Sequence, residues 1–399
     1  MMEPVSADDP TPRAFLRVGG AMVARHQLSL VLAAGCGRVI CIARAIGPEL
    51  VELQHDAEKA GASFHVVPGS RGLSGLVTAA DEVLVLAEGL LPTAGDAVRL
   101  LGGPPAVFVQ PAEAGIPAGF ERIDLNQASA GMMLVPGRLV DRLMELTPDA
   151  DPGSALLRIA LQAGVAQRAV PDEVRLGGRW LLVRSEGEAQ AAEDGWMARH
   201  TAGGPATPGP VVARMLVRHF GPALLHGGSA SLVGVTTGVL FAAMALAAAW
   251  FGFFAIALVF AGVGWVIRRA SGLLEALQSE ALAGGNDNSW RDAAYELAFD
   301  VLIGAILVMA SPSLPGELLF ERWFAPIMLI GLLRLLPRGF PSEWSAWATD
   351  RLVLVFLLSG MVVGRVIDPG VPALAALLLL AGLVLPRDDE PGKRASPVG

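Results

Sequence analysis

The chain has 399 residues, of which 53% are hydrophobic and 17% charged, and its formal net charge at pH 7 is −8. This acidic balance argues against a nucleic-acid partner, because nucleic-acid-binding domains present a basic surface. Residues 1–225 are polar and rich in Pro and Gly, whereas residues 229–386 are mostly long apolar runs. The composition therefore predicts one globular domain followed by a membrane domain.

The N-terminal residues and the cysteines both indicate the cytoplasm. Residues 1–13 are acidic and polar, and they lack the apolar segment of a secretory signal peptide. Cys36 and Cys41 lie in or near an apolar strand pattern and do not have the CxxC spacing that is typical of metal sites. We expect them to be buried thiols of a reducing compartment rather than a disulfide or a metal pair.

The first 200 residues alternate between strand and helix patterns. Strands are expected at 39–43, 63–67, 82–89 and 106–110, and helices at 48–61, 72–80 and 97–103. Such alternation predicts a doubly wound α/β sheet, whose ligands bind at the C-terminal ends of the strands. Glu88 and Asp124 fall at such ends, where they either hold a Mg²⁺ on nucleotide phosphates or serve as a solvated loop acid and a turn residue.

The segment LAAGCGR (32–38) is similar to the Gly-rich phosphate loop of sugar-nucleotide and cytidylyl transferases. Its context argues against that function, because Arg38 leads directly into the apolar run VICIA and no Pro-Lys pair follows. Residues 21–35 have helical spacing and end on Gly35, a residue typical of a helix C-terminus. We therefore expect a helix, a turn and a strand here, and no phosphate loop.

The membrane half contains six apolar segments, predicted as spans at 230–249, 251–268, 293–311, 318–336, 351–367 and 371–386. The domain boundaries follow as 1–200 for the α/β domain, 201–210 for a Gly/Pro-rich linker, 211–225 for an interfacial amphipathic helix and 226–390 for the membrane domain. A plain linker helix is the alternative for 211–225.

Basic residues set the expected orientation. Arginines flank one end of the predicted spans, at positions 214, 218, 268, 269, 291, 334, 338, 351 and 387. The positive-inside rule makes that side cytoplasmic. We expect a multi-pass protein of a bacterial-type inner (plasma) membrane, with the N-terminal domain and the C-terminus in the cytoplasm.

Three acids begin the third apolar segment: Asp292, Glu296 and Asp300. Their spacing places them on one helix face, and carboxylates at a membrane boundary are costly and commonly functional. The alternative is a solvated first turn, where negative charge suits the helix dipole. Arg268 and Arg269 either bind a phosphate or anionic headgroup, or simply form the basic flank of the second segment.

This order of domains, with acids opening the third span, resembles the CDP-alcohol phosphatidyltransferases, in particular those fused to an inositol-phosphate cytidylyltransferase. That family's motif, D-x2-D-G-x2-A-R-x8-9-G-x3-D-x3-D, supplies four carboxylates that hold two divalent cations on the CDP diphosphate. The resemblance implies that Asp292 and Glu296 are metal ligands for Mg²⁺ or Mn²⁺ and that Glu296 is the catalytic base. It also implies a nucleotidyltransferase-like front domain and a homodimer formed through the membrane domain.

The first half of the motif is altered. Gly272 can take the glycine position, but Arg268 and Ser271 stand where two aspartates belong, and Glu275 and Ala276 replace Ala-Arg. The second half of the motif fits better, with Asp292 and Glu296 in place and Asn288 instead of its glycine. We therefore expect a degenerate, catalytically weak or inactive relative that binds membrane lipid, a nucleotide or a CDP-alcohol, or supports a membrane partner. The alternatives are an active Mg-dependent transferase with unusual ligands, and an unrelated multi-span protein or transporter.

Overall fold

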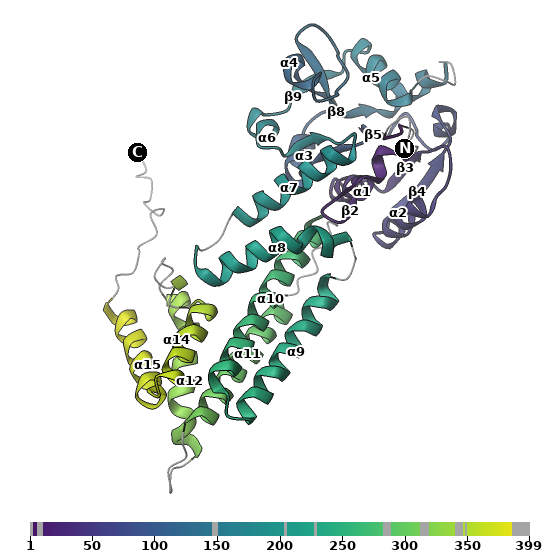
Figure 1. Ribbon diagram of the computed structural model, residues 1–399. Coiled ribbons are helices and arrows are strands. Elements are labelled where there is room, and N and C mark those ends of the chain that lie inside the picture. The colour runs from purple at the N-terminus through teal and green to yellow at the C-terminus, as the bar shows by residue number, and fades with distance from the viewer. Residues whose placement is uncertain are drawn as a thin grey trace, which may run out of the picture. The chain divides into compact units, whose positions relative to one another are not determined.

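The structure is a computed structural model (Figure 1). It describes residues 3–5, 11–145, 151–202, 206–226, 230–281, 289–311, 319–339, 346–347 and 349–384. The chain forms two compact units: Met1–His200 with Leu277–Gly285, and Thr201–Ala276 with Asn286–Gly399. The first unit is an α/β domain and the second is helical, as the composition predicted.

The largest sheet described in the first unit is mixed rather than doubly wound and parallel. Strands β3 (Arg38–Ile42) and β4 (Ser63–Val67) form a parallel pair. A four-stranded sheet has the order β5-β8-β7-β9, in which β8 is antiparallel to β5 and β7, and β9 is parallel to β7. The bounds of its strands are Glu82–Leu86 (β5), Ala106–Pro111 (β7), Gln127–Pro136 (β8) and Ala166–Ala169 (β9).

The reversal of β8 has a physical cause in the connection before it. A parallel return crosses the sheet, usually through a full helix that covers one of its faces. Between β7 and β8 the chain forms only the short helix α4 (Ala112–Gly115) before it turns back beside β7. The strand pattern thus predicted the element but not its direction.

The remaining elements of the first unit are short strands, helices and 3₁₀ turns. The strands form two antiparallel pairs, β1 (Arg17–Val18) with β2 (Ala21–Met22) and β6 (Leu90–Pro92) with β10 (Trp180–Leu182). The helices are α1 (Val23–Ala33), α2 (Pro48–Lys59), α3 (Ala94–Leu101), α5 (Pro152–Gln162), α6 (Asp172–Leu176) and α7 (Glu186–Ala202). The 3₁₀ turns are η1 (Arg13–Phe15), η2 (Ser70–Leu73) and η3 (Gly137–Glu145).

The predicted order of helix, turn and strand around LAAGCGR is confirmed. Helix α1 ends at Ala33, and Gly35 has a φ of +82°. The Gly35 N–H donates to the Leu32 carbonyl and the Cys36 N–H to the Val31 carbonyl, both at 3.0 Å. This is the Schellman arrangement, in which a left-handed glycine closes a helix. Strand β3 then begins at Arg38.

The prediction of a helix at 72–80 is wrong. Only a 3₁₀ turn, η2, forms there, and it ends at Leu73. Gly75, with a φ of +80°, lies two residues further along the chain. The left-handed conformation at that glycine is incompatible with a continuing right-handed helix. A helical spacing of apolar residues was therefore overridden by local backbone chemistry.

The two main sheets of the first unit each pack against helices through an apolar core. Leu50, Leu53 and Phe64 pack between α2 and the β3–β4 pair. A second core joins the β7–β8 part of the larger sheet to α5 and η3, and it includes Val107 and Leu156. Burial of these side chains, at about 25 cal/mol per Å² of apolar area, is the main force that holds the sheet between its helices.

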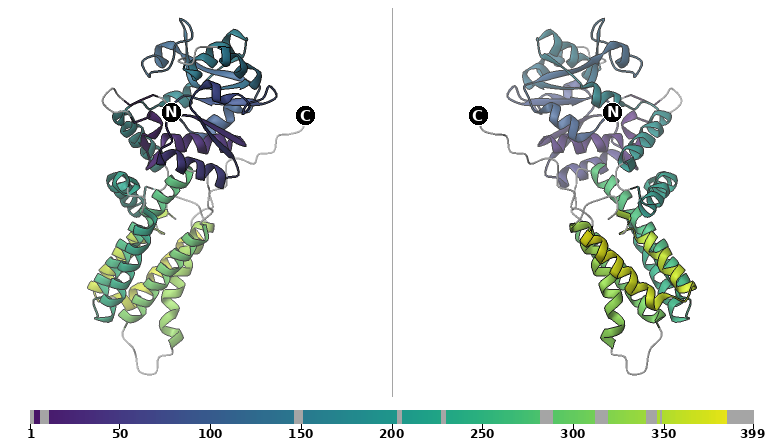
Figure 2. Two further views of the ribbon diagram at one scale, coloured as in Figure 1. Left: turned by 90° about the vertical axis from the view of Figure 1, so that its right-hand side faces the viewer. Right: turned by 90° about the vertical axis from the view of Figure 1, so that its left-hand side faces the viewer.

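The second unit is a set of helices, most of which lie alongside one another (Figure 2). Their bounds are Pro208–His226 (α8), Ala230–Trp250 (α9), Phe254–Ala281 (α10), Ser289–Ala310 (α11), Leu319–Gly339 (α12), Arg351–Val363 (α14) and Ile367–Val384 (α15). Their shared core includes Leu258, Ile303, Ile306, Leu329 and Leu358. Many large apolar side chains on the outer faces are exposed instead, which is typical of a surface that contacts lipid.

Among the described residues, three helical stretches are long and apolar enough to cross a membrane: Phe254–Glu275, Trp290–Ala310 and Ile367–Val384. The stretches Gly234–Trp250 and Arg351–Val363 are apolar but shorter. The chain is thus a membrane protein by this criterion, and the finer prediction of six spans is not established. One predicted span, 351–367, is cut short because α14 closes at Arg365, a non-glycine residue with a φ of +55°.

Candidate functional site

The candidate site lies on the face of α11 that carries the three acids, against α10, α12 and α14. Asp300 is the deepest of them, with only 3% of its surface exposed. Its Oδ2 accepts from Arg334 Nε of α12 at 2.6 Å and from Arg351 Nη2 of α14 at 3.2 Å. A buried carboxylate requires such partners, because its desolvation is otherwise prohibitive. Asp300 thus joins three helices.

The charges around Asp300 do not balance. Two guanidinium groups meet one carboxylate, and Arg351 is itself 6% exposed. Among the described residues, Arg351 Nε and Nη1 and Arg334 Nη2 are buried without a hydrogen-bond partner. Buried donors normally have acceptors, so this cluster carries one excess positive charge and several donors available to an acceptor.

Asp292 is also held by an arginine. Arg268 Nη2 of α10 lies 2.8 Å from Asp292 Oδ1, and Arg268 Nη1 lies 3.7 Å from Glu275. The same guanidinium lies over the ring of Tyr295, 4.9 Å from its centroid. The side chain of Asp292 is 65% exposed, so this pair is weaker than the buried one. We call the three acids on this face of α11, Asp292, Glu296 and Asp300, the acid stripe. Arg268 pairs with one member of the acid stripe instead of replacing an anion within it.

Glu296 lies between the other two acids and has a neutral partner. Its Oε1 accepts from Trp265 Nε1 of α10 at 3.2 Å. Arg269, the neighbour of Arg268, is exposed on α10. All three acids of the stripe thus point at neighbouring helices, but each is engaged by a different partner.

Ser271 occupies a position where the resemblance expects an aspartate. It is 7% exposed, and its Oγ donates to the Ile267 carbonyl at 3.0 Å. Helix α9 passes directly over it, since a Cβ atom added to Gly234 would lie 2.1 Å from Ser271 Oγ. No space exists there for a carboxylate, so the local packing and the sequence change agree.

These residues do not fit a two-cation centre. Among the described residues, no group of three or more His, Cys, Asp or Glu side chains lies close enough to hold a metal ion. Two bridged cations need several anionic oxygens around them. Here Asp292 is neutralised by Arg268, and Asp300 by Arg334 and Arg351.

Glu88 and Asp124, the two acids of the first unit that were candidate Mg²⁺ ligands, have structural partners. Asp124 Oδ1 accepts from the N–H groups of Asn126 and Gln127, both at 2.8 Å, which forms a turn. Glu88 accepts from the backbone N–H groups of Glu3 and Ala14. These contacts match the turn and loop roles that were the alternative to a Mg²⁺ site.

The roles of Arg334 and Arg351 escaped sequence reasoning. Both were assigned to a basic flank of the spans, whereas their guanidinium groups turn inward to Asp300. The available signal was that these arginines sit at the ends of apolar helices opposite an acid within an apolar run, where charges commonly pair.

A scan against protein-family models finds no match to this chain, and a search of curated proteins finds none either.

Proposed function

We propose that the chain is a non-catalytic membrane protein that binds a phosphate-bearing, anionic lipid headgroup or CDP-alcohol at the arginine-rich end of its helical unit. In this proposal it shares the architecture of the CDP-alcohol phosphatidyltransferases but does not perform their metal-dependent transfer. The observation that carries the proposal is the charge balance at α11: Asp292 and Asp300 are both held by arginines.

Electrostatics supports binding without catalysis. A carboxylate that already pairs with a guanidinium has a low affinity for a metal cation. The arginine repels the cation and also competes for the same carboxylate oxygens. The buried donors of Arg351 and Arg334 favour an anion instead. Guanidinium groups recognise phosphate through paired, charge-assisted hydrogen bonds, and Arg268 and Arg269 extend the positive charge on α10.

The finer topology belongs to the same proposal. Six spans, with the first unit and the C-terminus in the cytoplasm of a bacterial-type plasma membrane, follow from the arginine distribution. Helix α8 would lie at the membrane surface, because Met215 and Phe220 are exposed while Ala213 and Val217 are buried against the unit. A nucleotidyltransferase-like origin for the first unit and a homodimer are further parts of the proposal.

The test is CMP release by the full chain in nanodiscs. The protein is supplied with CDP-diacylglycerol or CDP-inositol and Mg²⁺ or Mn²⁺, beside an active CDP-alcohol transferase in identical nanodiscs. We expect no release above that of empty nanodiscs. In the same preparation, binding of a fluorescent phosphatidylglycerol should saturate and should weaken on Arg351→Gln, whereas phosphatidylcholine should not compete.

A second candidate function, an active transferase, is favoured by one feature: Glu296 has no cationic partner among the described residues and accepts only from Trp265. Metal-dependent CMP release that Asp292→Asn abolishes would replace the proposal with this one. Absence of both release and saturable lipid binding would leave the transporter alternative.

A further inference from the structure

One buried acid of the first unit, Asp96 of α3, holds two arginines. Asp96 is 3% exposed. Arg99 Nη2 donates to its Oδ1 at 2.9 Å, and Arg179 Nη1 lies 2.8 Å from its Oδ2. A buried carboxylate needs such partners, so Asp96 anchors both guanidinium groups. Both side chains still reach solvent, since that of Arg99 is 76% exposed and that of Arg179 is 35% exposed.

A third arginine, Arg199 near the end of α7, lies against the turn that precedes Arg179. A Cβ atom added to Gly178 would lie 2.9 Å from Arg199 Nη1, and one added to Gly195 would lie 3.4 Å from the same atom. Gly178 also has a φ of +65°, so a glycine there serves both the turn and the close approach of this guanidinium. Arg179 Nη2 donates to the backbone carbonyl of Glu173 at 3.2 Å. The turn thus holds Arg179 and Arg199 close to each other.

This arginine cluster, Arg99, Arg179 and Arg199, has more positive charge than its acid neutralises. Asp96 is the one described carboxylate that forms an ion pair with any of the three. Within the described ranges, Arg199 has neither a hydrogen-bond acceptor nor an ion-pair partner. Burial and then the charge of Arg179 lower the pKa of the Arg199 guanidinium. The surroundings therefore disfavour its charged form, and a bound anion would relieve this.

Other arginines of the first unit are matched one to one with an acid. Examples are the pairs Arg25–Asp56, Arg158–Glu121, Arg175–Asp172 and Arg184–Glu188. The arginine cluster differs because three guanidinium groups share one carboxylate, which leaves two positive charges. Like charges held together by a fixed turn are costly, and such arrangements commonly belong to sites that bind an anion.

We propose that the arginine cluster binds a phosphate dianion, presented as a phosphomonoester or a diphosphate. A guanidinium group donates paired, charge-assisted hydrogen bonds that match the spacing of phosphate oxygens. A dianion also neutralises the two remaining positive charges. The ligand is either a soluble phosphate ester or the phosphomonoester headgroup of a lipid, and both present the same chemistry. The site uses residues of the first unit alone, so it does not depend on lipid binding at α11.

The test is arginine-specific labelling of the full chain in phosphatidylcholine nanodiscs. Phenylglyoxal modifies guanidinium groups, and mass spectrometry measures the labelling rate at each arginine. Inorganic pyrophosphate, compared with sodium chloride of equal ionic strength, should protect Arg179 and Arg199 in a saturable way. The labelling rate should fall about tenfold when pyrophosphate is present at ten times its Kd. Arg158, whose side chain is 71% exposed and paired with Glu121, is the internal control and should keep its rate.

Matched variants test whether the two arginines act together. Arg179→Gln should raise the Kd obtained from protection of Arg199 about tenfold, because one charge-assisted contact is lost. Arg199→Gln should do the same to protection of Arg179, whereas Arg158→Gln should leave the Kd unchanged. Thermal unfolding reports whether each variant is folded.

Nanodiscs that contain phosphatidic acid identify the source of the phosphate. Slower labelling of Arg179 and Arg199 there, without pyrophosphate, assigns the site to a lipid headgroup. Protection by pyrophosphate alone assigns it to a soluble phosphate ester. The proposal is overturned if neither anion protects these two arginines in the folded chain. It is also overturned if Arg158 is protected to the same extent, because the effect would then be nonspecific.

Discussion

The backbone N–H of Gly209, at the start of α8, donates to the Asp350 carboxylate at 2.8 Å across 141 positions of sequence. The other oxygen of Asp350 caps α14 by accepting from Leu352 N at 2.8 Å and Val353 N at 3.3 Å. One buried acid thus satisfies the first turns of two helices, and both helix dipoles stabilise its charge. A Cβ atom on Gly209 would lie 2.7 Å from Asp350, so only glycine fits there.

We predict that Asp350→Ala destabilises the helical unit by about 2–4 kcal/mol, because it removes a cap and leaves the Gly209 N–H buried without an acceptor. Asp350→Asn should cost less, since the amide oxygen still accepts one bond. Thermal unfolding in detergent micelles measures both. Asp368→Ala, an exposed acid in the first turn of α15, is the control and should change stability by less than about 0.5 kcal/mol. An equal loss of stability in Asp350→Ala and Asp368→Ala would contradict the conclusion that Asp350 links α8 to α14.

A second prediction concerns the pairing energies of the acid stripe. A double-mutant cycle on Asp300→Asn and Arg351→Gln should give a coupling above about 1 kcal/mol, because removal of one partner leaves a buried charge. The matched cycle on Asp292→Asn and Arg268→Gln should give less than about 1 kcal/mol, because Asp292 is 65% exposed. Denaturant titration of the four single and two double variants provides the values. A larger coupling energy at the exposed pair would contradict the conclusion that Asp300 is the acid that joins the helices.

Elements that depend on nearby residues were predictable from the sequence, whereas features that depend on long-range packing were not. The glycine at 35, the β-branched run after it and the apolar lengths of the membrane segments are local signals, and they placed α1, β3 and most of the membrane helices within a few residues. The exception is α10, which continues to Ala281, well beyond the predicted end of its apolar segment at residue 268. The direction of β8 was not accessible, because it depends on how a connection packs. The helical spacing at 72–80 failed because the backbone at Gly75 is left-handed.

The candidate site shows the same division. The spacing of Asp292, Glu296 and Asp300 predicted a shared helix face, and all three do point at neighbouring helices. Their partners are distant in sequence: Arg334 and Arg351 lie 34 and 51 positions from Asp300. No periodicity encodes such a pairing, and a rule that counts basic residues at span ends treats inward and outward arginines alike.

A third prediction tests whether the altered motif can be restored. Ser271→Asp should destabilise the helical unit and should not raise Mn²⁺ affinity, because Gly234 of α9 leaves no room for a carboxylate. Gly234→Val should destabilise it by the same contact, whereas Ser271→Ala should be nearly neutral, since it loses only a bond to its own helix. Electron paramagnetic resonance of bound Mn²⁺ and thermal unfolding measure the two effects. Tighter Mn²⁺ binding by Ser271→Asp would show that α9 yields and that a metal site can be rebuilt.

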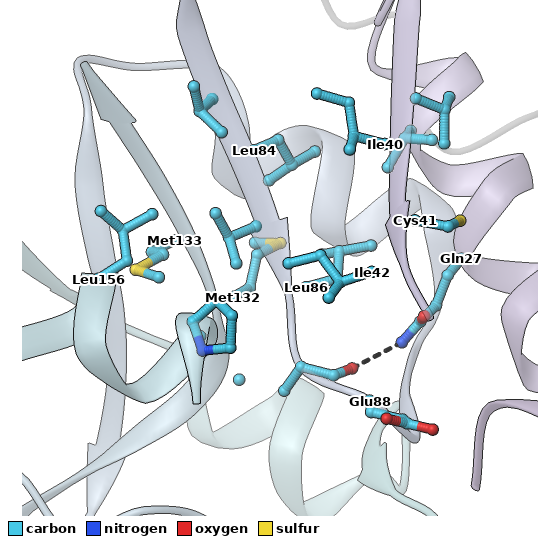
Figure 3. Close-up of a pocket in the computed structure, with 18 of the residues that line it drawn as sticks. Gln27, Ile40, Cys41, Ile42, Leu84, Leu86, Glu88, Met132, Met133 and Leu156 are labelled. Atoms are coloured by element: carbon cyan, nitrogen blue, oxygen red, sulfur yellow. Dashed lines mark hydrogen bonds between the residues drawn. The ribbon is translucent and has the colours of Figure 1, made fainter. Parts of the chain in front are cut away.

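The last prediction concerns the thiol of Cys41, one of the residues that line a pocket in the first unit (Figure 3). Burial raises the pKa of Cys41 to about 11, and burial also raises the pKa of Cys36. Only the thiolate is alkylated, so Cys41 should react with iodoacetamide at pH 8 about a hundredfold more slowly than a free thiol, and its rate should rise about tenfold per pH unit toward the folded pKa. A raised pKa also means that the stability contributed by the protonated thiol is complete below the unfolded pKa and is lost as the pH rises through about 11. Mass spectrometry of the alkylated full chain, with Cys41→Ser to isolate Cys36, gives the rate at each pH. Fast alkylation of Cys41 in folded protein at pH 8 would show that water reaches this thiol freely, contrary to the burial that raises its pKa.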